Sequence, residues 1–521
     1  MQMFTLALSV GIYSYLIFGL GILGLLYKQT IIIVTALTLL FSLLFLSRKN
    51  IWVFRLPKKL TFSVFLTILL VIQVLVNLVG ALGPELGFDA LWYHLTLPKI
   101  YFENHSIDYI PGGLLYYSAM PKLTEMLYVA GLALGSEIFP KLIHFSFGIL
   151  CLLAIYKVAR KFLSKNYSLL VLVLFYSNLV VGWMSITAYI DLARTFFEMM
   201  ALWAFLEWIE KKEQKWLVIS AVMLGFAIST KLLAMGSLFI FSVIIILVFL
   251  KNKKQFSNLT IGLFVYWLIC LLIPLPWFVF SFVHTGNPVY PFFTNIYPVK
   301  LNFNLINPLT LSDPISPIYV IFLPTALFLY GKFKPALKIV LLYSFLAVAF
   351  WHLTPQTGGG RFILPYLPAL SLVSILVIAL IRKNKLQKIF IWLIIFLGFF
   401  SIFYRGIANF KYVPVILGAQ SKSQFLSGNL NFSFGDFYDT DGYFAKKIKE
   451  GDKVLLYGFH NLYYVNFPFI DASYVKKGDM FNYIAVQEDN FPERFKFWNL
   501  IYYNKKTDVK LYSIGGLKWA Y

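Results

Sequence analysis

Asp89 is the side chain whose type and setting first suggest chemistry, within the stretch ELGFDALWYHLTLPKIYFENHSIDY at residues 85–109. This polar and aromatic stretch follows a strongly apolar run that ends near Leu82. A carboxylate placed where an apolar segment has just reached water can take a proton from a hydroxyl group. The simpler alternative is that Asp89 caps a short helix, which contributes ~1 kcal/mol.

Aromatic and polar side chains follow Asp89 closely in the sequence. They are Trp92, Tyr93, His94 and Lys99. Indole and phenol rings gather where a membrane meets water, and the ring nitrogens and the amine add polar groups to the same stretch. These four residues are candidates for binding a substrate.

A second acid, Asp191, lies in SITAYIDLARTFFEMM at the start of an apolar run. An acid at the bilayer centre costs ~2.5 to 3.5 kcal/mol, so an ionisable group in such a run is a functional candidate. Asp191, Arg194 and Glu198 are spaced three and four residues apart, which places them on one helix face. The spacing fits a charge ladder without function. It also fits a site in which Asp191 faces Asp89 across a water-filled outer cavity while Arg194 holds it.

Two basic residues are candidates for binding a phosphate. Lys231 lies in GFAISTKLLAMG, where a lysine that snorkels to the membrane surface is the alternative. Arg361 ends the glycine-rich turn TPQTGGGR. An arginine there could grip a phosphate by two parallel hydrogen bonds, or it could anchor the chain at the interface.

The composition is that of an integral membrane protein. Of the 521 residues, 60% are hydrophobic and 13% are charged, and the mean hydropathy is +0.75, which is too apolar for a water-soluble globule. The formal net charge of +22 would suggest a nucleic-acid partner in a soluble protein. The basic residues lie between the apolar runs, so they indicate membrane topology and we expect no nucleic-acid partner.

Neither a metal site nor a disulfide follows from the sequence. Cys151 and Cys270 fall inside apolar runs, where a thiol behaves as a small hydrophobe. His94, His284 and His352 lack the spacing of metal ligands. No P-loop, GxSxG, HExxH or paired CxxC motif is present, which argues against an ATP-driven pump, a serine hydrolase and a zinc protease.

Thirteen apolar runs are long enough to cross a ~30 Å hydrocarbon core, so we predict a mainly α-helical membrane bundle of about thirteen spans. The first run lacks a basic leading region and a cleavage site, and we expect it to be a retained span. The predicted spans cover residues 4–26, 31–47, 60–82, 139–156, 167–184, 191–209, 216–232, 234–250, 257–283, 315–330, 336–353, 362–381 and 389–408.

Lys and Arg concentrate in alternate loops between these spans. The positive-inside rule makes the rich loops cytoplasmic, so we predict the N-terminus inside and the C-terminus outside. Residues 123–134 are apolar but short, and we expect them to form a helix at the outer interface within one outer loop, 84–138. The rich loops are 48–59, 157–165, 211–215, 251–254, 332–338 and 382–388.

The composition changes from about residue 410, where short β-prone runs begin. They predict a small extracytoplasmic α/β domain. We therefore expect two transmembrane helices and a basic loop in 1–59, a catalytic membrane module in 60–409, and the α/β domain in 410–521. The predicted strands are 453–458, 472–475, 482–487 and 509–515.

The order of these features resembles the GT-C superfamily of polyprenyl-phosphate-sugar-dependent glycosyltransferases. Within it the chain is similar to the bacterial branch related to family 39, the mannosyl- and aminoarabinose-transferase-like group and the Rgt-type enzymes. The chain departs from the family 39 pattern in having Asp89–Ala90 in place of an acidic pair, and in two spans that precede the similar region. The similarity covers roughly residues 60–380 and depends on FDALWYHLTLPKIY, PGGLLYYSAMPKLTEML, AYIDLARTFF, GFAISTKLLA, HTGNPVYPFF and GGGRFILPYLP, in that order.

The resemblance implies an enzyme that moves a hexosyl or pentosyl group from a polyprenyl-phosphate donor to an extracytoplasmic hydroxyl. The acceptor would be a glycolipid, a polysaccharide or a protein. Asp89 would be the base of an inverting displacement, and Asp191 matches the second acidic position. Lys231 and Arg361 would stabilise the departing phosphate, with or without a divalent metal ion, and no other cofactor is expected. The implied location is a bacterial-type inner membrane, with the lipid bilayer as a partner.

Two other functions share some of these features. A transporter or flippase for a lipid-linked saccharide would explain many spans and buried charges, but it predicts internal repeats and helices broken at the membrane midplane. A ligase or polymerase with a polyprenyl-diphosphate donor would share the cavity but would need basic residues for two phosphates.

Overall fold

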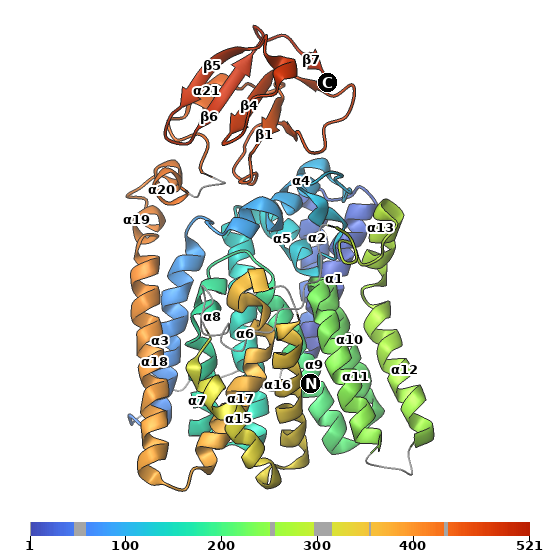
Figure 1. Ribbon diagram of the computed structural model, residues 1–521, viewed down its shortest axis with the longest axis vertical. Helices are drawn as coiled ribbons and strands as arrows, with labels where there is room; N and C mark the ends of the chain where they lie inside the picture. Colours follow the sequence, from blue (N-terminus) through green and yellow to red (C-terminus); the bar gives the residue numbers. More distant parts are fainter. Residues whose placement is uncertain (1, 46–58, 251–255, 296–314, 354–355, 432–435) are drawn as a thin grey trace.

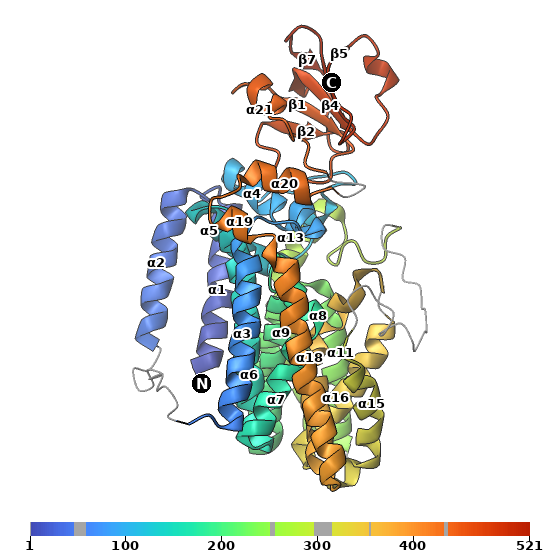
Figure 2. The ribbon, with the colours of Figure 1, turned by 90° about the vertical axis from the view of Figure 1, so that its left-hand side faces the viewer.

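The structure is a computed structural model that describes residues 2–45, 59–250, 256–295, 315–353, 356–431 and 436–521. Figures 1 and 2 show a bundle of long helices with a small sheet domain of C-terminal residues at one end. The predicted basic loop 251–254, and all of the loop 48–59 except Lys59, lie outside the described residues.

Most of the described chain is helical, as the apolar runs predict. The longer helices are α1 (Gln2–Ile22), α2 (Lys28–Phe45), α3 (Phe62–Leu82), α4 (Thr96–Asn104), α5 (Leu123–Leu134), α6 (Ile138–Phe162), α7 (Lys165–Tyr176), α8 (Leu179–Met184), α9 (Asp191–Lys211), α10 (Gln214–Thr230), α11 (Met235–Leu250), α12 (Phe256–Leu272), α13 (Leu275–Thr285), α15 (Pro317–Phe328), α16 (Pro335–His352), α17 (Leu367–Leu380), α18 (Asn384–Phe410) and α20 (Lys422–Asn429). Shorter turns of helix are η2 (Ala90–His94), η3 (Tyr116–Ala119), η4 (Leu232–Ala234), η6 (Tyr330–Lys332), η7 (Gln356–Phe362), η8 (Leu364–Tyr366), α19 (Val413–Ile416), α21 (Tyr443–Lys447) and η9 (Glu493–Phe495).

The predicted number of thirteen spans is not confirmed. By length and composition, 6 helices of the described chain could each cross a membrane, or up to 7 if the bent pair α12 and α13 is one span. Several other predicted spans coincide with shorter apolar helices. Residues 123–134, which the sequence predicts as a helix at the outer interface and not as a span, form the 12-residue helix α5. The 6 helices are Gln2–Ile22, Phe62–Leu82, Ile138–Phe162, Leu232–Leu250, Pro335–His352 and Asn384–Phe410.

Two of the predicted spans are broken for identifiable reasons. In 167–184, the side chain of Asn178 donates to the carbonyls of Leu174 and Phe175, both at 2.9 Å, and the chain restarts as α8. In 257–283, the helix bends by 61° where Pro274, which lacks a backbone N–H, follows α12. Hydropathy measures the length of an apolar run and does not detect either break.

The helix α9 lies in the centre of the bundle. It packs against α6 and α10, and almost all of its side chains are buried. A helix covered on every side can carry charged residues only if they find partners within the protein. The first residue of α9 is Asp191, so this helix brings that acid deep into the structure.

The C-terminal domain holds a five-stranded sheet in the order β2-β1-β4-β6-β5. β1 pairs in parallel with β2 and β4, whereas β6 is antiparallel to β4 and β5. A second sheet pairs β3 with β7. The strands are β1 (Val454–Tyr457), β2 (Phe469–Asp471), β3 (Met480–Phe481), β4 (Tyr483–Gln487), β5 (Asn499–Asn504), β6 (Val509–Ser513) and β7 (Trp519–Ala520).

Three of the four predicted strands are confirmed, as β1, β4 and β6. The predicted strand 472–475 is wrong, because these residues form a turn after β2. Asp471 directs this turn, since its carboxylate accepts the backbone N–H of Ser473 at 2.8 Å. Asp and Ser at such positions favour turns, which outweighs the β-propensity of the residues that follow.

Candidate active site

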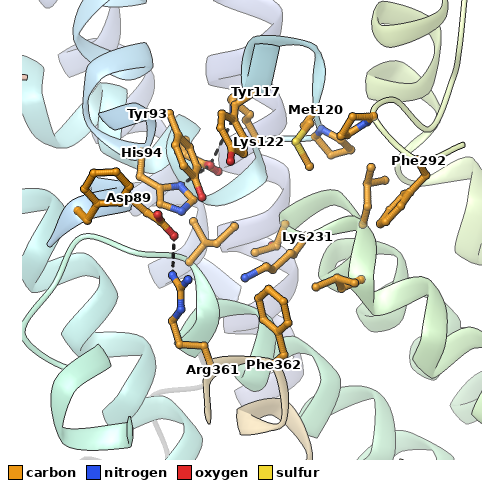
Figure 3. A pocket seen from close by; sticks show the side chains of 18 residues that line it. Asp89, Tyr93, His94, Tyr117, Met120, Lys122, Lys231, Phe292, Arg361 and Phe362 are labelled. Atoms are coloured by element: carbon orange, nitrogen blue, oxygen red, sulfur yellow. Dashed lines mark hydrogen bonds and ion pairs between the residues drawn. The ribbon is translucent and has the colours of Figure 1, made fainter. Parts of the chain in front are cut away.

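Asp89 lies at the start of the single π-helical turn η2, a few residues after α3. Its backbone is helical, with φ −63° and ψ −31°, but its side chain makes no capping hydrogen bond. The alternative that Asp89 serves as a helix cap is therefore not supported. Its backbone N–H donates to the hydroxyl of Tyr189 at 3.1 Å, and its carboxylate points into a cavity (Figure 3).

The cavity has a volume of about 350 Å³. Its walls come from η2, the start of α5, the junction of α10 with η4, and η7. One part of the lining is polar and the other is apolar. The polar and titratable lining residues are Asp89, Tyr93, His94, Tyr117, Lys122, Glu125, Thr230, Lys231 and Arg361. The apolar ones are Phe88, Met120, Pro121, Ile190, Leu232, Leu233, Pro291, Phe292 and Phe362.

Arg361 is the direct partner of Asp89. Its Nη1 lies 2.6 Å from Oδ2 of the carboxylate. Gly359 turns the chain just before it with φ +59°, a conformation that glycine adopts without steric cost. Burial opposes the charge on Arg361, but the carboxylates of Asp89 and Asp191 outweigh burial, so the pKa of the guanidinium is raised.

Asp191 and Lys231 form a second ion pair, with Nζ 2.7 Å from Oδ1. Asp191 is completely buried and does not line the cavity, whereas Lys231 does. Asp191 therefore does not face Asp89 across open water. The pair presents a positive charge to the cavity and buries the matching negative charge behind it.

Arg194 does not hold Asp191. Its Nε lies 2.5 Å from Oε1 of Glu198, one turn along α9. Glu198 also accepts hydrogen bonds from the hydroxyls of Ser237 and Tyr343. Arg194 and Glu198 thus form the intrahelical pair that their spacing allows, and neither side chain lines the cavity.

A cluster of three ionisable residues, His94, Lys122 and Glu125, also lines the cavity, and the sequence predicts only His94 among them as a site residue. Nδ1 of His94 lies 2.9 Å from Oε1 of Glu125, and Nζ of Lys122 lies 3.5 Å from the same oxygen. All three side chains are almost fully buried. The available signal was the three-residue spacing of Lys122 and Glu125 at the start of the predicted interfacial helix.

Glu85 and Lys141 fix the loop that leads from α3 to Asp89. Oε1 of Glu85 accepts the backbone N–H groups of Leu86 and Gly87 at 2.8 and 2.7 Å, and Oε2 accepts that of Ala188 at 2.6 Å. Lys141 donates to three backbone carbonyls around the end of α3. Glu85 thus joins the loop of Asp89 to the loop that leads into α9.

The other predicted binding residues divide between the cavity and its surroundings. Tyr93 lines the cavity. Trp92 donates its indole N–H to the carbonyl of Leu114 at 3.0 Å and does not line it. Lys99 lies outside it as well, because its amine donates to two backbone carbonyls in 463–465.

The sheet domain contacts the turn that carries Asp89. The backbone N–H of Tyr463 donates to the carbonyl of Leu91 at 3.1 Å, and the hydroxyl of Tyr464 donates to the carbonyl of Glu85 at 2.9 Å. The C-terminal domain therefore forms part of the support of the loop that leads to Asp89.

The described residues contain no group of three or more His, Cys, Asp or Glu side chains that could hold a metal ion. Both carboxylates of the cavity lining, Asp89 and Glu125, are paired with protein cations or an imidazole. A divalent ion stays an expectation of the sequence resemblance.

Comparison with known proteins supports the fold. The sequence model of a family described as dolichyl-phosphate-mannose-protein mannosyltransferase matches residues 127–280, from α5 to α13. This segment contains Asp191 and Lys231 but neither Asp89 nor Arg361. No curated protein matches the chain.

Solved structures match far more of the chain. ArnT from Cupriavidus metallidurans bound to undecaprenyl phosphate is similar with a TM-score of 0.58 and 14% identity, over 86% of this chain and 98% of that chain. Its apo state gives a TM-score of 0.57 and 14% identity, over 86% and 97%. The S. cerevisiae Pmt1-Pmt2 complex bound to the sugar donor gives a TM-score of 0.34 and 18% identity, over 44% and 35%.

The chain has the fold of ArnT, which confirms the fold that the sequence resemblance implies. The match to ArnT extends over nearly the whole of that protein, so the fold is shared as a unit and not through a few helices.

Proposed function

We propose that this protein is a membrane glycosyltransferase. It moves a sugar from a polyprenyl-phosphate donor to a hydroxyl group of an extracytoplasmic acceptor, which is a glycolipid, a polysaccharide or a protein. The observation that carries the proposal is one cavity, in a GT-C fold, in which a carboxylate that can accept a proton lies beside an arginine and a lysine.

The charges of the cavity fit a phosphate leaving group. Lys231 and Arg361 both line it, and each has its carboxylate partner on its own side. When the bond between the sugar and the phosphate breaks, negative charge grows on the phosphate oxygens. Preorganised cations stabilise that charge without reorganising at the moment of reaction. Arginine adds a planar pair of donors that matches two phosphate oxygens.

The apolar part of the lining fits the lipid portion of the donor. Met120, Leu232, Leu233 and Phe292 line the same cavity as the charged residues. A polyprenyl chain is a hydrocarbon, so its first units gain free energy from burial against such side chains, at ~25 cal/mol per Å². Polar and apolar lining in one cavity is what a lipid-linked phosphate requires.

Asp89 is the proposed base. Arg361 contacts Oδ2 of the carboxylate, so Oδ1 can turn to an acceptor hydroxyl. The hydroxyl oxygen attacks the anomeric carbon while the bond to the phosphate breaks and Asp89 takes the proton. A single displacement of this kind inverts the configuration at the anomeric carbon. Asp191 holds Lys231 in place through their ion pair.

The proposal is tested with Asp89→Asn in proteoliposomes that contain a radiolabelled polyprenyl-phosphate sugar and an extract of candidate acceptors. Loss of a general base typically lowers a rate by 10²- to 10⁴-fold, so we expect turnover to fall by about 10³-fold. Asp108→Asn is the matched control, because Asp108 is exposed on the same outer loop. Retained turnover in a correctly inserted Asp89→Asn protein contradicts the assignment. Movement of intact donor across the bilayer without transfer supports a flippase instead.

A further inference from the structure

His94 and Glu125 form a paired imidazole and carboxylate in the wall of the cavity that holds Asp89. Nδ1 of His94 lies 2.9 Å from Oε1 of Glu125, and both side chains are almost fully buried. His94 and Asp89 line the same cavity, and Figure 3 draws them on the same side of it. The charge of Asp89 acts on the imidazole of His94. The mechanism proposed above leaves this pair without a role.

The pair fixes which nitrogen of His94 can accept a proton. Lys122 and His94 outweigh the effect of burial on Glu125, so the pKa of that carboxyl is lowered and it is ionised. An ionised carboxylate only accepts hydrogen bonds. Nδ1 of His94 must therefore carry the hydrogen, and Nε2 holds the lone pair. A carboxylate that orients an imidazole through Nδ1 and leaves Nε2 as a base is the arrangement of the catalytic triads.

Asp89 is a poor final position for the proton of the acceptor. A protonated Asp89 would lose its ion pair with Arg361, whose Nη1 lies 2.6 Å away in a largely buried site. A nearby neutral imidazole with its own carboxylate can take the proton and restore the pair of Asp89 with Arg361.

We propose that His94 is a proton relay: its Nε2 receives the proton that Asp89 takes from the acceptor, and Glu125 is a positioning residue for it. This inference rests on the proposed function. The acceptor O–H bond breaks as the new bond to the anomeric carbon forms, and the bond electrons of the leaving group pass to the phosphate oxygen. The proton moves from the acceptor oxygen to Asp89, then to Nε2, and finally from the imidazolium to water.

The surroundings of His94 predict its charge in the resting enzyme. Burial is the largest effect and lowers the pKa of His94, while Glu125 opposes it in part. The imidazole is therefore neutral at neutral pH and able to accept a proton. The titratable groups that face it from the packed elements are Asp89, Tyr93, Lys122, Glu125, His144 and Tyr189.

The pH dependence follows with a definite sign. The relay works only when His94 is neutral, so turnover should fall as the pH drops through the pKa of His94, which lies below the ordinary ~6.5. Glu125→Gln removes the negative charge that stabilises the imidazolium, so it should move this acidic limb to lower pH. A purely structural role of Glu125 would lower the rate at every pH without moving the limb.

The test is the pH profile of sugar transfer by the full-length protein in proteoliposomes, for wild type, His94→Gln and His94→Gly. Glutamine can still donate to Glu125 but cannot carry the proton, so we expect turnover of His94→Gln to fall by about 10²-fold with unchanged donor binding and no acidic limb. Imidazole added to His94→Gly should raise the turnover of this variant at least about tenfold. His284→Gln is the matched control, because His284 lies on α13 and does not line the cavity.

The outcomes separate the relay from the proposed function. If the wild type transfers sugar and His94→Gln keeps both its rate and its acidic limb, the relay is wrong while the glycosyltransferase stands. If His94→Gln loses donor binding together with turnover, and imidazole restores nothing in His94→Gly, His94 is structural and the relay is also wrong. If the wild type transfers no sugar from any polyprenyl-phosphate donor, the proposed function fails and the relay fails with it.

Discussion

Glu85→Gln is the substitution whose effect the structure defines most closely. The carboxylate is 1% exposed and accepts three backbone N–H groups, two from its own loop and one from Ala188. A glutamine keeps only one carbonyl oxygen. Its amide N–H₂ group takes the place of the other carboxylate oxygen and cannot accept the backbone N–H groups that this oxygen bound. At least one hydrogen bond to a charged group is lost, at ~1.5 to 3 kcal/mol, and one buried N–H is left without an acceptor.

The expected loss of local stability is therefore ~2 to 3 kcal/mol, which is on the order of 30- to 150-fold in the opening equilibrium of the two loops. Hydrogen–deuterium exchange measured by mass spectrometry should show faster exchange in 85–89 and 186–190. Sugar transfer should fall as well, because the opened loop no longer holds Asp89 beside Arg361.

The control is Glu103→Gln. Glu103 is 58% exposed and lies 4.0 Å from its partner Lys99, and such surface pairs contribute ~0 to 1 kcal/mol. It should leave exchange in both loops unchanged. If Glu85→Gln exchanges in 85–89 and 186–190 at the wild-type rate, the carboxylate does not join the two loops and the argument is refuted.

Three further predictions concern the support of the site. Gly112→Ala should reduce turnover and loosen the sheet domain, because φ at Gly112 is +95° and a Cβ there would lie 2.0 Å from the carbonyl oxygen of Ser473. Gly113→Ala, where the space is open, should behave as wild type, and the rate of proteolysis of the C-terminal domain compares the two variants. Lys231→Met should lower the thermal midpoint of unfolding in detergent much more than the double variant Asp191→Asn/Lys231→Met does. The single change leaves the buried carboxylate of Asp191 without its lysine partner, which costs ~3 to 5 kcal/mol of stability. Equal shifts of the midpoint would contradict the pairing. Burial raises the pKa of Asp471, so the contribution of this carboxyl to stability is present below its unfolded pKa of ~3.9 and is lost as the pH rises through the folded pKa. Asp471→Asn should therefore stabilise the protein at pH 7 more than at pH 4. A stability difference between variant and wild type that does not change with pH would contradict this.

The sequence predicts which charged residues line the cavity because it indicates on which side of the membrane each of them lies. Asp89, Lys231 and Arg361 each border an apolar run on the side that the basic loops mark as outer, and the structure places all three around one cavity. Sequence order does not predict the pairing within that set. Asp89 and Arg361 are 272 positions apart, and only the tertiary fold decides that they meet.

The partners that the sequence analysis missed share a physical reason. Lys122, Glu125 and Lys141 lie in or beside apolar runs, where a charged residue resembles one that snorkels to the membrane surface. In the structure all three are buried and bonded within the protein. Their role depends on groups from other segments, so no periodicity within their own segment could reveal it. The number of spans could not be predicted from the sequence for a similar reason, because a side chain such as Asn178 ends a helix inside an unbroken apolar run.

The position of Asp89 at the start of a short helical turn, directly after a loop, explains why so much of the protein surrounds it. A residue within a long helix is fixed by its own backbone hydrogen bonds, whereas a residue that follows a loop also depends on what the loop contacts. Glu85 and Lys141 hold the loop from the bundle, Tyr189 binds the backbone N–H of Asp89, and the segment 463–464 holds the loop from the sheet domain. Because these contacts come from three different parts of the chain, the carboxylate keeps its place only when the bundle, the α9 loop and the C-terminal domain are assembled together.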